Sequence, residues 1–414
     1  MSLELNRHKG NPIQTLVDEL GRSSPVLNSD VGAYAHLQLG TSLVGLGQFE
    51  SAATDLKHAI ALAELRSRFS TSLAAITELA TAAGLDGDIK GMVEYSNSAL
   101  AYGNRHHLTH SPEYKNCLTT AALTAYLRGE SRPPVSGTPI TRSTVATTQY
   151  SYRAPGSLAA LIGGLYESER DPTSRHASVA RVRDAAIDAI AEKTSQILTS
   201  ALLPIAVQSC LGVGETEWAD RLLHDAVHEF GEAAELNLAR ALVRFATGRL
   251  KESRESLIVA HSSRDQLHLI NDIYLLALEA VTAAAENKPR DAFGALRSAL
   301  TIAEPGQVLR PFLDLAGPLR PLLDEFTTRF DEQESFAQSV RARMSPVTTT
   351  PQLLTPAEQH VLLHLGAGGT TGEIADALFL SVNTIKTHLR GIYRKFDVTS
   401  RRDAIRAARK HGFL

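Results

Sequence analysis

The segment Thr370–Phe396, TTGEIADALFLSVNTIKTHLRGIYRKF, decides the fold of the chain from residue 353 onward. Apolar residues recur along it with the three- and four-residue spacing of an amphipathic helix. Four basic residues are concentrated in its second half: Lys386, Arg390, Arg394 and Lys395. This pattern fits either an ordinary helix with a solvated face or a helix that lies against an anionic surface. Capping signals and the distribution of charge separate the two.

Four helix starts are marked by capping residues, whose hydroxyl accepts a hydrogen bond from a free backbone N–H group. They begin the segments Thr355–Glu358, Thr370–Glu373, Ser381–Thr384 and Ser400–Asp403. The run Gly366–Gly369 ends the first helix, Gly412 ends the last, and only Phe379 and Leu380 separate the middle two. Two short helices joined so tightly predict a helix-turn-helix.

The third of these helices has a core face and an open face on a wheel with 100° per residue. The core face carries Ile385, Leu389, Ile392 and Phe396. The open face carries groups able to read base edges, namely Asn383, Lys386, Thr387, Arg390 and Arg394. One flank carries groups able to hold phosphates, namely Thr384, His388 and Lys395, although His388 also fits a hydrogen-bonded core histidine.

Charge favours DNA as the surface that this helix contacts. A solvated face normally mixes signs, yet no acidic residue occurs between Asp376 and Asp397. Thr370 and Thr371, at the start of the second helix, offer further hydroxyl and N–H groups to a DNA backbone.

Residues 354–414 resemble the C-terminal domain of LuxR-type regulators, the NarL/GerE class. The shared motifs are LTP·E···L at the start, EIA··L··S··TIK·H···IY·K in the centre and V·SR··AI··A···G at the end. The resemblance implies a third helix in the major groove, with base contacts from Lys386, Thr387 and Arg390 and backbone contacts from Thr384, His388 and Lys395. It also implies a homodimer formed through the last helix, Arg401 to His411.

Two positions depart from that family. Ala357 stands where the family usually has an Arg before the first-helix Glu, so we expect an internal ion pair to be lost. Thr371-Gly372 replaces the usual Asn-x pair before EIA, so we expect one weaker phosphate contact. Neither departure undoes the resemblance.

The chain before residue 350 is predicted to be all-α, because Ala- and Leu-rich segments recur with helical periodicity and short Gly, Asn or Asp breaks. Small and large residues alternate around turns at Gly47, Gly87, Gly214, Gly248 and Asn287, with a weaker copy ending at Gly129. This pattern resembles tetratricopeptide repeats, in which antiparallel helix pairs stack on one another. An irregular helical bundle is the alternative. The uncharged run at 194–214 is long enough to span a membrane. It contains polar residues and Pro204, however, so we expect a buried helix and not a membrane span.

Changes in composition predict the domain boundaries. We expect N-terminal helical repeats at 1–130, a loop or insertion at 131–157 and a second repeat array at 158–330. A linker at 331–352 then precedes a four-helix domain at 353–414. The segment Ala303–Leu323 resembles the end of the helical repeats in large MalT-like LuxR regulators. The ATPase domain of those proteins is not expected, because the dipeptide Gly-Lys of a phosphate-binding loop is missing from the sequence.

Bulk properties indicate a globular protein of the cytoplasm. Hydrophobic residues make up 43% and charged residues 21%, and the start of the chain resembles no signal peptide. Two cysteines, Cys117 and Cys210, suggest buried apolar positions in a reducing compartment. Residues 351–414 hold nine Lys and Arg and five Asp and Glu, a net charge of about +4. The remaining 33 Lys and Arg and 40 Asp and Glu lie in residues 1–350, which gives that part a net charge of about −7. An acidic body with a basic domain is typical of a sensor joined to a nucleic-acid binder.

The sequence therefore predicts a sequence-specific DNA-binding transcriptional regulator. Its partners would be promoter DNA, a second copy, RNA polymerase and a peptide or small-molecule effector on the repeats, without a membrane. The alternative is a non-enzymatic interaction scaffold. We expect no catalytic site, cofactor or metal, and interpret the histidines of His106–Tyr114 as a solvated loop. Whether the acidic body covers the basic helix or acts independently is left open.

Overall fold

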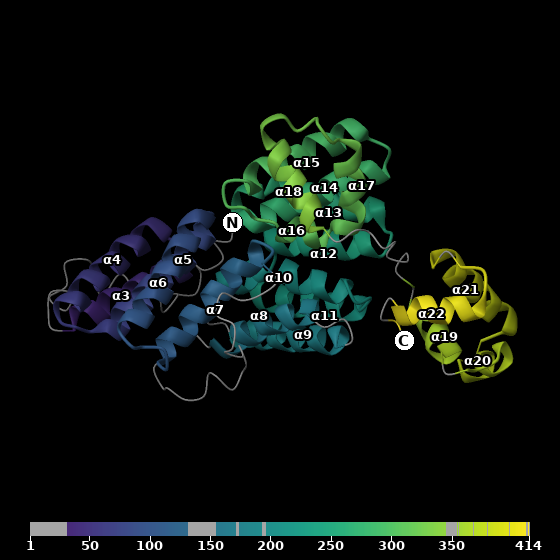
Figure 1. Cartoon of the computed structure of the whole chain (residues 1–414), viewed down its shortest axis with the longest axis horizontal. Coiled ribbons are helices and arrows are strands. Elements are labelled where there is room, and N and C mark those ends of the chain that lie inside the picture. Colours follow the sequence, from purple (N-terminus) through teal and green to yellow (C-terminus); the bar gives the residue numbers. More distant parts are fainter. Residues whose placement is uncertain are drawn as a thin grey trace.

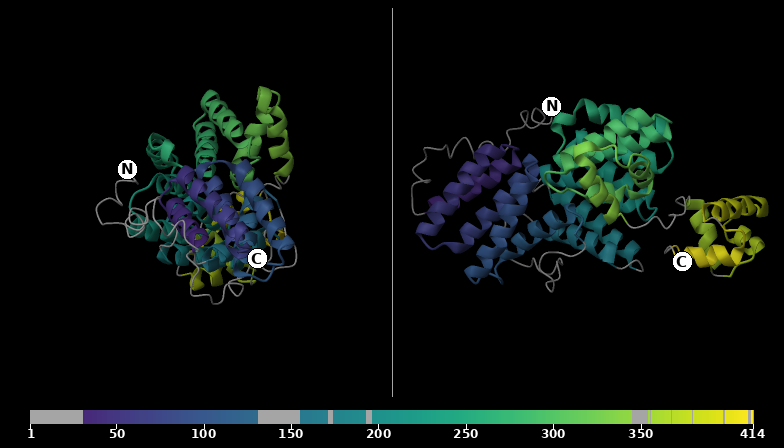
Figure 2. Two further views of the ribbon diagram at one scale, coloured as in Figure 1. Left: turned by 90° about the vertical axis from the view of Figure 1, so that its left-hand side faces the viewer. Right: turned by 45° about the horizontal axis from the view of Figure 1, so that its top comes forward.

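The computed structural model describes residues 31–130, 155–170, 174–192, 196–344, 354, 356–366, 368–378, 380–396, 398–410 and 413. Among these residues the secondary structure is helical throughout, without a strand, which confirms the predicted all-α class. Figure 1 shows a large body of helices and, apart from it, a small group formed by α19–α22. The right-hand view of Figure 2 shows the same separation.

The body is built largely from consecutive antiparallel helices. Its α-helices are α3 (Gly32–Gly45), α4 (Phe49–Leu65), α5 (Phe69–Asp86), α6 (Ile89–Arg105), α7 (Pro112–Leu127), α8 (Pro155–Arg170), α9 (Arg175–Glu192), α10 (Gln196–Leu211), α11 (Thr216–Phe230), α12 (Ala234–Ala246), α13 (Leu250–Ser262), α14 (Leu269–Ala285), α15 (Pro289–Ala303), α16 (Arg310–Asp314), α17 (Ala316–Glu325) and α18 (Glu334–Arg343). Two 3-10 turns lie at Arg264–Gln266 and Asp331–Gln333.

Tight left-handed turns join the helices at the predicted breaks. The φ angles are 74° at Gly47, 90° at Gly87, 83° at Gly214, 76° at Gly248 and 59° at Asn287. Gly and Asn tolerate this conformation best, which explains why the breaks carry these residue types. The predicted small positions are fully buried, as at Ala52, Ala219 and Ala292, so paired helices pack closely. The structure thus shows the predicted helix pairs, whereas their assignment as tetratricopeptide repeats stays a prediction.

The described part of the uncharged run at 194–214 contains the buried helix α10, as predicted. Leu202, Leu203, Ile205, Ala206 and Val207 are at most 4% exposed, and Pro204 lies inside the helix. Within the described residues, none of the helices is long and apolar enough to cross a membrane. Cys117 and Cys210 are buried, and burial raises the pKa of both thiols to about 12.

The two predicted repeat arrays share one hydrophobic core, which runs from Leu39 on α3 to Met344 after α18. Tyr166 on α8 donates a hydrogen bond to the carbonyl of Ala122 on α7, at 3.0 Å. At the end of α7, the carbonyl of Leu127 accepts a hydrogen bond from the N–H group of Leu309, just before α16, at 3.1 Å. The body is therefore continuous across residues 131–154, which lie outside the described residues.

Two helices lie across the predicted boundaries, which themselves stay a prediction. Helix α8 begins at Pro155, so residues 155–157 belong to the second array and not to the loop. Helix α18 lies within the predicted linker 331–352, but Phe336, Val340 and Met344 are at most 3% exposed and join the body core. The segment 331–352 is polar overall, which predicts a linker, although Phe336, Val340 and Met344 recur in it at the four-residue spacing of a helix. The remaining part of the linker, 345–352, lies outside the described residues, as do residues 1–30 of the first predicted domain.

A buried ionic cluster around Arg310 connects four helices of the body. Arg310 on α16 forms salt bridges with Asp314 of the same helix and with Glu169 on α8. Its guanidinium lies 4.3 Å from the ring centroid of Tyr126 on α7. Tyr274 on α14 donates a hydrogen bond to Asp314. Burial by itself lowers the pKa of Arg310, but Asp314, Tyr126 and Glu169 outweigh it and raise that pKa well above its ordinary value.

We predict that Arg310→Met destabilises the body by about 3 kcal/mol, because it leaves the nearly buried Asp314 carboxylate without its counter-charge. The denaturation midpoint of the full chain, followed by circular dichroism, measures this effect. Arg254→Met is the matched control, since the Arg254–Glu286 pair is half exposed and should contribute less than about 1 kcal/mol. Equal effects of the two substitutions would contradict a special role for the Arg310 cluster.

Candidate nucleic-acid interface

Four short helices with their own hydrophobic core form the basic domain. They are α19 (Pro356–Gly366), α20 (Thr371–Ala377), α21 (Val382–Lys395) and α22 (Arg401–Lys410). The core includes Val361 and Leu365 from α19, Ile374 from α20, and Ile385 and Ile392 from α21. Helix α20 ends four residues before Ser381, the N-cap of α21, which confirms the predicted helix-turn-helix.

Capping residues begin three of these helices as predicted. Thr370 and Glu373 form a reciprocal capping box at α20, in which the Thr370 N–H group donates to the Glu373 carboxylate at 2.7 Å. This bond lowers the pKa of Glu373. Ser381 accepts from the Thr384 N–H group at α21, and Ser400 accepts from the Asp403 N–H group at α22, both at 3.1 Å. The predicted cap Thr355, and the positions Phe379, His411 and Gly412, lie outside the described residues.

Helix α21 separates into a core face and an open face as its sequence predicts. Ile385 and Ile392 are 0% exposed, and Leu389 and Phe396 are 9% exposed. The predicted base-reading side chains are all exposed: Asn383, Lys386, Thr387, Arg390 and Arg394. His388 is half-buried at the flank, and therefore is not a fully buried core histidine.

Lys386, Arg390 and Arg394 form a row of basic side chains on the open face of α21, which we call the basic row. Among the described residues, none of the three takes part in a salt bridge. The acidic body leaves them exposed to solvent in this structure. As far as the described residues go, the basic row can therefore meet a polyanion without first breaking an ion pair.

Three hydroxyls predicted to contact DNA, two at phosphates and that of Thr387 at a base, already donate or receive hydrogen bonds within the domain. The Thr370 hydroxyl lies 2.8 Å from the Glu373 carboxylate, and the Thr384 hydroxyl lies 2.8 Å from that of Ser381. The Thr387 hydroxyl donates to the Asn383 carbonyl at 3.1 Å. A phosphate oxygen accepts hydrogen bonds but cannot donate them, so the hydroxyls of Thr370 and Thr384 must reorient to contact it. Thr371, half-buried in the first turn of α20, presents the helix N-terminus beside them.

Lys395 is engaged inside the domain, which sequence reasoning missed. Its ammonium lies 2.6 Å from the Glu358 carboxylate on α19, and the two side chains are only 13% and 8% exposed. The family resemblance suggested that an internal ion pair is lost with Ala357, yet Glu358 retains this one. The pair spans 37 residues, so no local spacing in the sequence could have revealed it.

Arg401 is a second residue whose role is visible only in the folded domain. It donates to the carbonyl groups of Leu365 at 3.2 Å and Gly369 at 2.7 Å, at the C-terminal end of α19. A cation there satisfies carbonyl groups that the helix leaves without partners. On the predicted dimer helix α22, Ala404 and Ala408 face the core at 0% exposure, whereas Arg402 and Arg406 are exposed.

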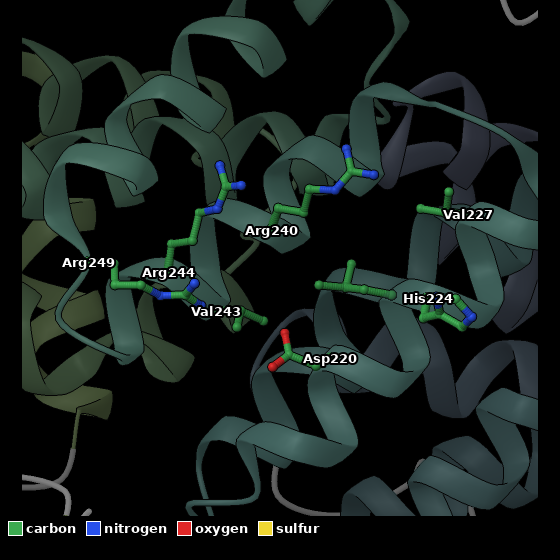
Figure 3. A pocket seen from close by; sticks show the side chains of 8 residues that line it. Asp220, His224, Val227, Arg240, Val243, Arg244 and Arg249 are labelled. Atoms are coloured by element: carbon green, nitrogen blue, oxygen red, sulfur yellow. The ribbon is translucent and has the colours of Figure 1, made fainter.

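The body contributes a second candidate site, a groove of about 330 Å³ between α11, α12 and α13. Figure 3 shows Arg240, Arg244 and Arg249 along one side of it, with Asp220 and His224 on α11 opposite. Leu223, Val227 and Val243 also line the groove. Glu232 accepts two bonds from Arg240, each 2.7 Å long, and Glu252 lies 3.4 Å from Arg249. The groove combines apolar lining residues with guanidinium groups, which bind carboxylates and phosphates well.

We predict that Lys395→Ala lowers the free energy of unfolding of the basic domain by about 3 kcal/mol, because Glu358 is left buried without its cation. Thermal unfolding of the full chain measures the loss. The double variant Glu358→Leu/Lys395→Met should recover most of the stability, since an apolar pair fits a nearly buried site. If Lys395→Ala lowered only DNA affinity and left unfolding unchanged, Lys395 would be a phosphate contact and not an internal one.

Residues 352–408 match the family model described as bacterial regulatory proteins, luxR family. The transcriptional regulator MalT of Vibrio campbellii is 26% identical over 228 residues, covering 46% of this chain and 25% of that protein. The CsgBAC operon transcriptional regulatory protein of Escherichia coli is 41% identical over 58 residues, covering 14% of this chain and 27% of that protein. The response regulator VraR of Staphylococcus aureus is 32% identical over 75 residues, covering 18% of this chain and 36% of that protein.

The MalT match covers more of the chain than the small domain alone, so the similarity extends into the helical body. The chain spans a quarter of the length of that relative. The helix-turn-helix geometry of α20 and α21 and the family match agree on the same segment. Residues 352–408 therefore form a helix-turn-helix domain of the luxR family of bacterial regulatory proteins, joined to a MalT-like helical body.

Proposed function

We propose that this chain is a DNA-binding transcriptional regulator in which α21 reads the major groove of promoter DNA. The exposed basic row is the observation that carries the proposal, because its three cations lie on one face without salt bridges among the described residues. Arg and Lys bind the acceptor atoms of guanine, and Asn383 and Thr387 add amide and hydroxyl groups beside them. Thr370, Thr371, Thr384 and His388 lie at the border of this face, where DNA phosphates would pass.

A protein-interaction scaffold is the rival function. A basic helix could bind an acidic protein, and the helical body could hold a peptide. Such binding requires charge complementarity but no preference for a base sequence. The luxR-family match of the basic domain favours DNA, and a measured base-pair preference would separate the two functions.

We also propose two partners for the regulator besides DNA. We infer a homodimer through α22, whose open surface carries Arg402 and Arg406 beside the half-buried Ile405. Two-fold symmetry would place one α21 on each half of a palindromic operator. RNA polymerase is the further partner through which a promoter-bound regulator would act.

The helical body would receive the signal. We place the effector in the arginine-lined groove of α11–α13, because its size suits a small molecule and its guanidinium groups suit an anion. The ligand class is a small metabolite that carries a carboxylate or phosphate group. A tetratricopeptide-like stack would in addition offer a surface for a peptide partner.

Substitutions in the basic row test DNA recognition. Lys386→Ala and Arg390→Ala should each weaken binding to a specific operator by about 1–3 kcal/mol and relax the preference at one base pair. Arg394→Ala should act in the same way, and each of the three substitutions should lower the salt dependence by about one counterion, because each removes one cation. An operator selected from random DNA with the purified chain serves as the probe in a gel-shift titration.

Lys251→Ala is the control for this series, because Lys251 is equally exposed but lies on α13 of the body. It should change neither affinity nor preference. If Lys386→Ala and Arg390→Ala combined left both quantities intact, α21 would not be the recognition helix.

The groove is tested by a panel of carboxylate and phosphate metabolites, scored by the melting temperature of the full chain. A metabolite that binds the native groove should raise the melting temperature of the wild type. The variant Arg240→Gln/Arg244→Gln should lose this response but keep operator binding in the absence of metabolite. A metabolite that stabilises both proteins equally would place the effector site elsewhere.

A further inference from the structure

Two histidines and an aspartate converge on the first described helix pair, far from the basic domain. His36 lies on α3, and Asp55 and His58 lie one turn apart on α4. Each offers one ligand atom, and the three atoms lie within 4.8 Å of one another. Among the described residues, this is the one group of three or more His, Cys, Asp or Glu side chains whose ligand atoms lie this close together.

Close packing of the two helices brings these groups together. A Cβ atom added at Gly40 would lie 2.6 Å from the Leu56 side chain and 3.3 Å from the Ala52 carbonyl oxygen. Gly40 thus lets α3 approach α4, and His36, one turn earlier on the same face of α3, meets Asp55. The His36 Nδ1 atom lies 2.9 Å from the Asp55 Oδ1 atom, with side-chain exposures of 11% and 3%.

The buried carboxylate of Asp55 is only half satisfied. Oδ1 is bonded to His36, but Oδ2 is buried without a hydrogen-bond partner. A carboxylate oxygen that is buried without a hydrogen-bond partner destabilises the folded state. The exposed ring of His58 completes the cluster from the solvent side, and its centroid lies 5.2 Å from that of His36.

We propose that His36, Asp55 and His58 bind one divalent transition-metal cation of the zinc type. Imidazole nitrogen and carboxylate oxygen are the ligands that such ions take in proteins, and three protein ligands leave one position for water or a small molecule. In tetrahedral zinc sites neighbouring ligand atoms lie roughly 3.3 Å apart. The His36–Asp55 separation therefore needs to widen by a few tenths of an ångström, while His58 turns inward.

The ion supplies what the cluster lacks. It satisfies the carboxylate of Asp55 with two positive charges and takes the place of the hydrogen bond between Asp55 and His36. It also joins α3 to α4 at a second point beside the Gly40 contact. The exposed position of His58 gives the ion a path from solvent, so binding does not require the helix pair to open.

Zinc titration of the full chain, freed of metals with a chelator that is then removed, tests the site. We expect one Zn²⁺ per chain by calorimetry and a higher melting temperature with Zn²⁺. His58→Gln should weaken this binding by more than about tenfold, and Asp55→Asn should do the same. His58 is exposed, so His58→Gln decides the matter even if Asp55→Asn fails to fold.

His228→Gln is the matched control. Its ring is 78% exposed and lies one turn from His224 on α11, the arrangement of a common surface zinc pair. This variant should bind Zn²⁺ as the wild type does. Unchanged affinity in His58→Gln, or a loss in His228→Gln instead, would overturn the proposal, as would a wild-type chain that binds no Zn²⁺ at micromolar concentration.

Discussion

The buried salt bridges of Arg310 are the interaction on which the body depends. One guanidinium meets Glu169 from α8 and Asp314 from α16 and lies over the ring of Tyr126 from α7, while Tyr274 from α14 binds the same aspartate. These helices come from both sides of residues 131–154. A buried charge tolerates little displacement of its partners, so the cluster sets how the first helices meet the last ones. His268 reinforces this arrangement through its bond to the Leu85 carbonyl, at 3.0 Å.

The basic domain repeats the same principle on a smaller scale. Its core is small, and the pair of Glu358 with Lys395 and the bonds of Arg401 to the end of α19 add polar connections between its helices. Two cations of the basic domain, Lys395 and Arg401, are therefore engaged in internal contacts. The cations that remain exposed on α21 form the basic row. Among its described residues, the domain thus divides its positive charge between internal connections and an outward surface.

The body offers binding chemistry at two places that differ in kind. The groove of α11–α13 presents guanidinium groups beside apolar residues and suits an anionic small molecule. The cluster of α3 and α4 presents nitrogen and carboxylate ligands and suits a metal cation. Both sites are formed by side chains from neighbouring helices of the body. A ligand at either place would stabilise the helices that it joins, which gives a helical body a direct way to respond to small molecules.

The sequence by itself determined the all-α class, the helix starts at Thr370, Ser381 and Ser400 and the open face of α21. These features depend on residues three or four positions apart, whose spacing the sequence displays directly. Tertiary structure alone decided that Lys395 binds Glu358, that α18 belongs to the body and that His36 meets Asp55 and His58. Each of these contacts joins residues from different helices. Their meeting depends on how helices pack, on small residues such as Gly40, and on burial that no local pattern records.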